Sequence, residues 1–318
     1  MKKDFWGILK RRAIFVVLIV LFVLFSLLTD KFLSVKNLLN IARQVAVLGI
    51  ASVGMTFVML IGGIDLAAGS VITIVNILVA YAMVNLGINP VVACMAGLLM
   101  AALIGFINGF VIANLNMPAL IMTFATQIVF EGLAYIICGG LPVFGFDKSF
   151  AYLGQGYFLG VPVPVWIMIA AFAVGIFILN KTFFGRHFYA TGSNEDAARF
   201  SGIRVKRIKY LVYTLSGLFA GLAGIVMLSR TNSGQPTAGK GFEFDIITAV
   251  VLGGVSVNGG SGKLSNVVAG VLIIGILGNG MALMDISSYY QMVVKGLILA
   301  FAVGFDCFQK IRLAKAKA

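Results

Sequence analysis

Long apolar segments follow one another along almost the whole chain, separated by short polar connections. The apolar core of a bilayer, ~30 Å thick, needs about 20 apolar residues for each helical crossing. The sequence therefore predicts an all-α polytopic membrane protein with about ten spanning helices in a single transmembrane domain, residues 1–318. We place the spans near 13–29, 45–62, 67–86, 90–113, 119–138, 164–180, 210–229, 246–259, 265–284 and 289–306.

The eighth predicted span, 246–259, is shorter than the others and is interrupted by Gly253-Gly254 and Gly259-Gly260. It is either a half-helix or an ordinary tilted helix. A broken helix is tolerated in a membrane only where protein or water covers the freed backbone groups. Such helices often mark a substrate path. Small residues also recur at every fourth position, at Gly97, Ala101, Gly105 and Gly109 and at Gly217 and Gly221. Such a stripe of small residues favours close helix packing.

One charged segment, residues 181–209, interrupts the apolar pattern between the sixth and seventh predicted spans. Two further basic clusters lie at the chain ends, Lys2, Lys3, Lys10, Arg11 and Arg12 at the start and Lys310, Arg312, Lys315 and Lys317 in the tail. Basic residues next to membrane spans are retained on the cytoplasmic side. An even number of spans places all three clusters there, so we expect cytoplasmic N- and C-termini and a cytoplasmic loop 181–209.

Composition excludes several classes of function. Hydrophobic residues make up 60% of the 318 and charged residues only 11%, against about 25% charged in soluble domains. The net charge of +13 is accounted for by clusters beside the spans, so we expect membrane lipid and no nucleic acid as a partner. With one histidine and three cysteines, no metal site is expected.

No site for energy conversion is visible either. The segment Gly259–Lys263 lacks the spacing of a phosphate-binding loop, because Val257 and Leu264 stand where Gly and Ser or Thr are needed. We therefore expect no cofactor and no enzymatic activity. The work of the protein must come from an ion gradient or from a partner that binds ATP.

Charged residues inside the predicted spans would support transport driven by an ion gradient. Glu131, with Gln127 one turn earlier, lies in the fifth span, and Lys295 lies in the tenth, from which it is expected to snorkel outward. Asp65, in GGIDLAAGS, is placed at a helix start, where an acid complements the helix dipole. These charges are isolated and form no relay of Asp, Glu or His side chains, so they are weak support for ion-coupled transport. A substrate path is assigned to Asp65, Gln127, Glu131, Gly253 and Gly254, with a structural hydrogen bond as the alternative for Glu131.

The partner option is better supported. The charged segment contains a motif, Asp196-Ala197-Ala198 followed by Gly202, that resembles the coupling motif of importer permeases driven by ATP-binding-cassette (ABC) subunits. The chain departs from that family in lacking its later hydrophobic-Leu-Pro element, near whose place Val212 stands. A short helix ended by glycine is what a groove on an ATPase can grip. The candidate coupling residues are Asn194, Glu195, Asp196, Ala197, Ala198, Arg199, Ser201, Gly202 and Ile203.

Four blocks in the same order extend this resemblance over nearly the whole chain. They are Gly49–Val71, Ala190–Lys209, Gln235–Lys263 and Asn279–Gly296, and they resemble the ribose/galactoside-type sugar permeases, the membrane subunits of bacterial monosaccharide importers. This chain departs from the family in having Ala67 where Ser is common and Glu131 where Arg is frequent. A reversed charge inside the membrane is not neutral.

The resemblance implies a fold similar to that of the cobalamin importer and a place in the bacterial inner membrane. It implies a second permease copy as homodimer partner, a cytoplasmic ABC ATPase that binds ATP, and a periplasmic sugar-binding protein. That protein would dock on the external segments Gly139–Pro164 and Arg230–Asp245, with Gln235, Glu243 and Asp245 as candidate contacts. Ribose or a galactose-like sugar is the expected cargo.

Two alternatives remain at this point. One is an ion-coupled secondary carrier or channel, which would not need Asp196 or Gly202. The other keeps the ABC machinery and carries a nucleoside, inositol or a furanosyl signal molecule.

Overall fold

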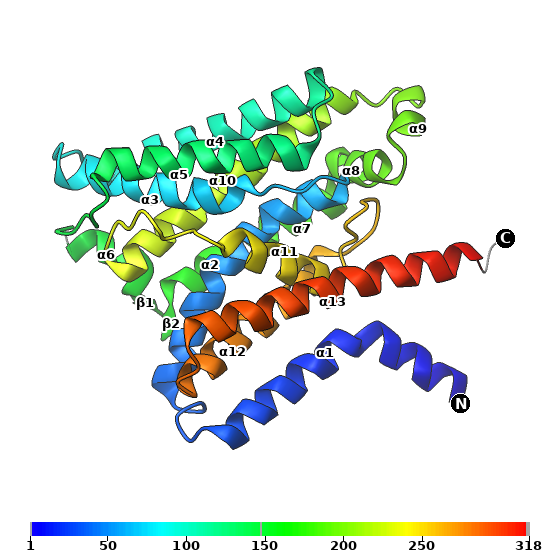
Figure 1. The fold of residues 1–318 in the computed structure, drawn as a ribbon, viewed down its shortest axis with the longest axis horizontal. Helices are drawn as coiled ribbons and strands as arrows, with labels where there is room; N and C mark the ends of the chain where they lie inside the picture. The colour runs from blue at the N-terminus through cyan, green and yellow to red at the C-terminus, as the bar shows by residue number, and fades with distance from the viewer. Residues whose placement is uncertain (1, 147, 316–318) are drawn as a thin grey trace.

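The computed structural model describes residues 2–146 and 148–315, and the side chains of residues 14–146 and 149–308. Its elements, in chain order, are α1 (Lys2–Leu28), α2 (Val35–Leu60), α3 (Ala67–Val84), α4 (Pro90–Asn114), α5 (Ala119–Cys138), α6 (Lys148–Gln155), β1 (Tyr157–Phe158), β2 (Val161–Pro162), α7 (Val163–Lys181), α8 (Phe183–Ser193), α9 (Glu195–Phe200), α10 (Val205–Thr231), α11 (Phe242–Leu252), α12 (Leu264–Leu283) and α13 (Ser288–Lys315). The two strands form one antiparallel hairpin. The chain is an all-α polytopic membrane protein (Figure 1).

Eight of the described helices are long and apolar enough to cross a membrane, namely α2, α3, α4, α5, α7, α10, α12 and the part of α13 up to Phe308. The first predicted span falls in α1, whose described apolar part is Ile14–Leu28. The eighth is the half-helix α11, which ends at Leu252. Its 11 residues extend about 16 Å at 1.5 Å per residue, half of the bilayer core. The half-helix interpretation is confirmed.

The second predicted span begins too late in the sequence. Helix α2 begins at Val35, where the Ser34 side chain accepts a hydrogen bond from the Asn37 amide. Lys36 and Arg43 therefore lie on a helix and not in a loop. The Arg43 guanidinium donates to the Gln155 carbonyl at 2.9 Å and lies 4.8 Å from the centre of the Tyr157 ring. These contacts join α2 to α6 and the hairpin.

Helix α10 lies at the centre of one packed group, with α4, α2 and α3 around it (Figure 1). The predicted small-residue stripes make this packing possible. A Cβ on Gly109 would lie 2.9 Å from the Lys209 carbonyl oxygen of α10, and one on Gly221 would lie 2.5 Å from the Ala101 Cβ of α4. The close packing predicted for the stripes is confirmed.

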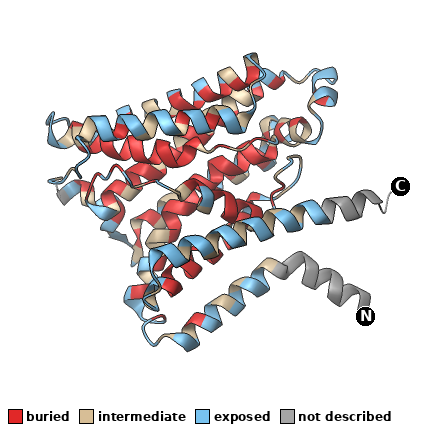
Figure 2. Cartoon of the chain, viewed as in Figure 1, coloured by how far each residue is buried: buried red, intermediate tan, exposed pale blue. Residues whose placement is uncertain are grey.

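A second group contains α7, α11 and α12, with α2 between the two groups. The core follows α2, α3, α10 and α12, whereas α13 and much of α5 remain exposed (Figure 2). The start of α1, the end of α13 and helix α9 lie at one end of the molecule; α6 and the hairpin lie at the other (Figure 1). The side chains of the two terminal basic clusters lie outside the described residues.

Candidate functional site

Asn194 separates the two short helices of the charged segment. Its backbone N–H donates to the Ala190 carbonyl at 3.1 Å, which closes the end of α8. Its side-chain Oδ1 accepts from the Ala197 amide at 2.9 Å, which caps the beginning of α9. Asparagine is among the best residues for this position, because its oxygen satisfies an amide that the helix leaves unpaired. One residue thus fixes the angle between α8 and α9.

Gly202 ends α9 in the left-handed region, with φ +86. Its amide donates to the Arg199 carbonyl at 3.0 Å, and the Ile203 amide donates to the Ala198 carbonyl at 3.1 Å. This pair of bonds is the Schellman arrangement, which needs a left-handed residue after the helix and usually finds glycine there. Helix α9 is therefore closed at both ends by the residues that the sequence singles out.

The two faces of α9 differ in what they present. On the inner side, Glu195 forms an ion pair with Lys209 of α10 at 2.9 Å, and Ala198 is buried. On the outer side, Arg199 lies 3.1 Å from Glu195 and 3.6 Å from Asp196, and the Phe200 side chain is 90% exposed. Exposed ion pairs stabilise little. The outer face thus presents an exposed aromatic side chain, a feature that the sequence prediction missed.

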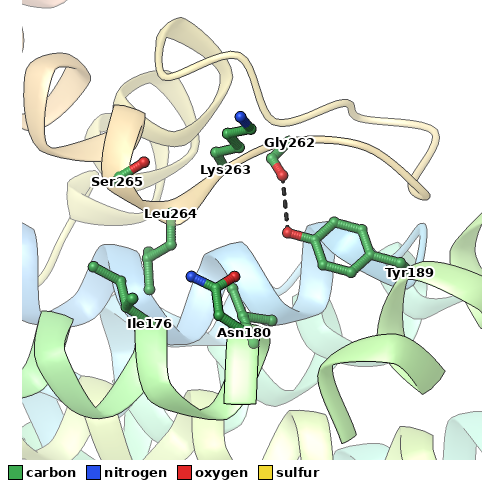
Figure 3. A pocket seen from close by; sticks show the side chains of 8 residues that line it. Ile176, Asn180, Tyr189, Gly262, Lys263, Leu264 and Ser265 are labelled. Atoms are coloured by element: carbon green, nitrogen blue, oxygen red, sulfur yellow. Dashed lines mark hydrogen bonds between the residues drawn. The ribbon is translucent and has the colours of Figure 1, made fainter. Parts of the chain in front are cut away.

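Helix α8 contacts the segment 253–263 that connects α11 to α12. The Tyr189 hydroxyl donates to the Gly262 carbonyl at 2.9 Å, and the two residues border a cavity of about 490 Å³ between the end of α7 and the start of α12 (Figure 3). Burial raises the pKa of the Tyr189 hydroxyl. The hydroxyl therefore keeps its proton and serves as a donor at neutral pH.

Three backbones meet beside this hydrogen bond. The Gly260 amide donates to the Leu60 carbonyl, the last residue of α2, at 2.9 Å. Gly192 of α8 packs so closely that a Cβ there would collide with the Leu60 oxygen, and it would lie 2.6 Å from the Gly260 nitrogen. The glycine-rich segment that lacks phosphate-loop spacing thus allows α8, α2 and the 253–263 segment to approach.

A group of polar side chains crosses the face formed by α5, α11 and α13, and we call it the polar strip: Gln127, Glu131, Glu243, Asp245 and Lys295. Gln127 Nε2 donates to Glu131 Oε1 at 3.1 Å and to Glu243 Oε1 at 2.9 Å, which joins α5 to α11. Lys295 Nζ lies 2.6 Å from Asp245 Oδ2, which joins α11 to α13. The half-helix is therefore tied on both sides by polar contacts.

The polar strip unites residues that the sequence analysis assigned to different roles. Gln127 and Glu131 were predicted for the substrate path, and Glu243 and Asp245 for contact with a binding protein. Glu243 is only 2% exposed and points inward, whereas Gln235 is exposed. Lys295, for which outward snorkelling was predicted, pairs with Asp245 in the first turn of α11. The two residues are 50 positions apart, so no local pattern announces the pair.

The remaining residues predicted for the path lie in two other places. Asp65 is buried between α2, α3 and α10, where its carboxylate accepts from the Ser216 hydroxyl at 2.7 Å and from the Ala67 amide at 3.1 Å. A Cβ on Gly253 would lie 2.6 Å from the Val267 Cα, so this glycine packs on α12. Gly254 is exposed and turns the chain after α11, with φ +80.

Comparison with known proteins places the chain in a family. The family model described as "Branched-chain amino acid transport system / permease component" matches residues 37–303. The ribose import permease protein RbsC of Bacillus subtilis (strain 168) is 45% identical over 304 residues, which cover 95% of this chain and 94% of the relative. RbsC of Escherichia coli (strain K12) is 43% identical over 92% of both chains.

An arabinose permease is nearly as similar. The L-arabinose transport system permease protein AraH of Escherichia coli (strain K12) is 42% identical over 96% of this chain and 93% of the relative. No solved structure matches the chain. The resemblance drawn from the four sequence blocks is confirmed. The chain belongs to the family of permease components of ABC import systems, among which it is similar to the ribose and arabinose import permeases.

Proposed function

We propose that the protein is the non-catalytic membrane subunit of a binding-protein-dependent importer, through which a monosaccharide enters a bacterial cell across the inner membrane. Two copies would form the path, an ABC ATPase would bind α9, and a periplasmic protein would deliver the sugar. The observation that carries the proposal is a continuous line of contacts from α9 to the polar strip.

This line begins at the outer face of α9 and continues through α8. The contacts of α8 with Gly260 and Gly262 transfer its displacement to the segment 253–263, which is the direct continuation of α11. Helix α11 carries the central residues of the polar strip. An ATPase that moves α9 would therefore shift the half-helix against α5 and α13, and the two polar links of the strip would break or rearrange.

The chemistry of the polar strip suits a sugar. Hydroxyl groups both donate and accept hydrogen bonds, and carboxylates and amides supply the complementary atoms. The strip lies between α5 and α13, whose large apolar side chains, including Ile136 and Phe301, are exposed. In a second copy facing the first, these surfaces would cover each other and the two polar strips would line one path. A pentose is the first candidate, since the similar permeases are named for ribose and arabinose.

The orientation of the chain follows from the same arrangement. An ATPase that reaches α9 requires this end of the molecule, with both chain termini, to be cytoplasmic. The opposite end, with α6 and the hairpin, then faces the binding protein, together with Gln235. The basic residues of the 181–209 segment agree with this orientation under the positive-inside rule.

The test is reconstitution of the purified chain in vesicles, alone and together with an ABC ATPase and a periplasmic sugar-binding protein from the same organism. We expect ATP-driven uptake of labelled ribose only from the complete set, and none from the chain alone under a proton or sodium gradient. Uphill uptake by the chain alone would establish the ion-coupled carrier instead. Competition by arabinose, galactose, inositol or a nucleoside in the complete system identifies the cargo.

A further inference from the structure

A cavity of about 670 Å³ lies between α9, the beginning of α10 and the end of α4. Five cationic side chains and one acid line it, and we call this group the basic pocket: Arg199, Arg204, Lys206, Arg207, Lys209 and Glu195. Apolar and polar residues from α4 and α10 complete the wall, among them Tyr210. The pocket is separate from the polar strip and opens at the end of two membrane-spanning helices.

The charges of the basic pocket are not balanced within the described residues. Glu195 is shared by Lys209, at 2.9 Å, and Arg199, at 3.1 Å, and Arg199 also lies 3.6 Å from Asp196. Lys206 contacts only a neutral oxygen, Asn114 Oδ1, at 3.3 Å. Arg204 and Arg207 form no ion pair within the described part of the chain. With Asp196 counted beside Glu195, the five cations of the pocket thus have a net excess of three positive charges.

The beginning of α10 adds to this positive potential. No side chain caps the helix at Arg204. The first amides of a long helix carry a partial positive charge and attract anions. A phosphate group in the basic pocket would therefore meet both mobile cationic side chains and a fixed helix dipole.

One wall of the pocket continues into an apolar surface. The Tyr210 ring lies 5.9 Å from the Phe106 ring and 5.7 Å from the Phe110 ring, and both phenylalanines belong to the membrane-spanning helix α4. Phe106 is 43% exposed and Phe110 is 49% exposed. A molecule with a phosphate at one end and hydrocarbon chains at the other matches this sequence of surfaces, whereas a free phosphate or nucleotide would use only the polar part.

We propose that the basic pocket binds the phosphate of an anionic phospholipid, with the acyl chains lying against Phe106 and Phe110. The lipid supplies the missing counter-charge beside the Glu195–Lys209 ion pair that holds α9 to α10. Basic pockets at the ends of membrane helices bind acidic headgroups in this way. Occupation of the pocket thereby stabilises the attachment of the coupling helix.

The test compares two double variants of the full-length chain purified in a mild detergent. Arg204→Gln/Arg207→Gln removes two cations of the pocket that lack acidic partners. Lys181→Gln/Arg186→Gln removes the same charge from exposed positions of the same segment outside the pocket. Thermal unfolding and native mass spectrometry are recorded with dioleoyl phosphatidylglycerol, dioleoyl phosphatidylcholine or inorganic phosphate.

Phosphatidylglycerol should raise the Tm of the wild type and remain bound in the mass spectrum, and phosphatidylcholine and inorganic phosphate should not raise the Tm. Each basic side chain near an anionic headgroup is worth roughly fivefold in affinity, so the pocket variant should bind phosphatidylglycerol about 30-fold more weakly. The control variant should bind it like the wild type. In phosphatidylcholine both variants should unfold at the wild-type temperature, which shows that the loss is not one of folding.

Three results would overturn the proposal. Equal loss in the two double variants would show general attraction to a basic surface. An increase in Tm with inorganic phosphate that matches that of the lipid would show a site for free anions. Absence of any preference for phosphatidylglycerol over phosphatidylcholine would show that no acidic headgroup is recognised.

Discussion

Replacing Gly202 by alanine adds one methyl group at the end of α9, the proposed coupling helix, where φ is +86. A Cβ at this position would meet no other atom within 4 Å. The cost therefore comes from the backbone conformation alone, roughly 1–2 kcal/mol for a residue other than glycine in the left-handed region. An effect of this size lowers the equilibrium constant between the capped and uncapped forms of α9 by about 5- to 30-fold.

A series of substitutions at Gly202 separates backbone strain from charge. Asparagine tolerates the left-handed region better than alanine, and valine tolerates it least. Binding-protein-dependent, ATP-driven uptake should therefore fall in the order Gly, Asn, Ala, Val. Aspartate has nearly the shape of asparagine but adds a negative charge at the C-terminal end of α9, where it opposes the helix dipole. Gly202→Asp should abolish uptake in a protein that still inserts into the membrane, and the difference from Gly202→Asn measures the charge effect.

Gly87 supplies the matched control for this series. It is exposed, has φ +64, and a Cβ there would meet no atom within 4 Å, but it lies in the α3–α4 turn. Gly87→Ala carries similar strain away from α9 and should transport at the wild-type rate. Uptake, ATP hydrolysis and the amount of inserted protein are measured for each variant in the reconstituted complex. Equal loss of uptake in Gly87→Ala and Gly202→Ala would refute the reasoning, as would normal uptake in Gly202→Val.

Three further substitutions test the line of contacts and the polar strip. Tyr189→Phe removes a hydrogen bond worth about 0.5–1.5 kcal/mol, so uptake per ATP hydrolysed should fall several-fold. Ser26→Ala, which loses a hydrogen bond to the Phe22 carbonyl in α1, should leave this ratio unchanged, and equal ratios in both variants would contradict the coupling role of Tyr189. Asp245→Asn and Lys295→Met each leave one partner of a partly buried ion pair without its counter-charge, so both substitutions should lower the Tm. The double variant should recover part of this loss. Additive losses in thermal unfolding would show that the two residues are not coupled. Glu131→Ala should change the rate of sugar uptake and leave co-purification with the ATPase intact, and loss of the ATPase would instead indicate a structural role.

Much of the fold follows from local signals in the sequence. Apolar segments of spanning length predict the long helices, and small residues at every fourth position predict the close packing of α4 on α10. The two ends of α9 could be predicted because Asn194 and Gly202 are suited to helix caps by their own chemistry. Such features depend on residues within a few positions of each other.

Other features depend on contacts that no local pattern records. The beginning of α2 at Val35 was missed, because Lys36 and Arg43 lower the hydropathy of its first turns. The polar strip was predicted only in fragments, since Gln127 and Glu243 lie 116 positions apart and meet only after folding. A short apolar run such as 246–259 leaves a half-helix and an ordinary helix equally open, and only the structure, in which α11 ends at Leu252 after 11 residues, decides between them.

The half-helix explains why charged side chains can lie among spanning helices. An isolated charge in a membrane is costly, and such residues are retained when they pair with each other or face a path. Helix α11 has about half the length of a spanning helix, and its polar partners belong to α5 on one side and α13 on the other. Under the proposed function, such a half-helix would be displaced without moving a complete span. Displacement toward either side would exchange one set of polar contacts for another within the strip. Under the proposed function, breakage of the Asp245–Lys295 ion pair and of the Gln127 amide bridge would distinguish the states of the path. Helix α8 contacts the segment through which that displacement would be imposed.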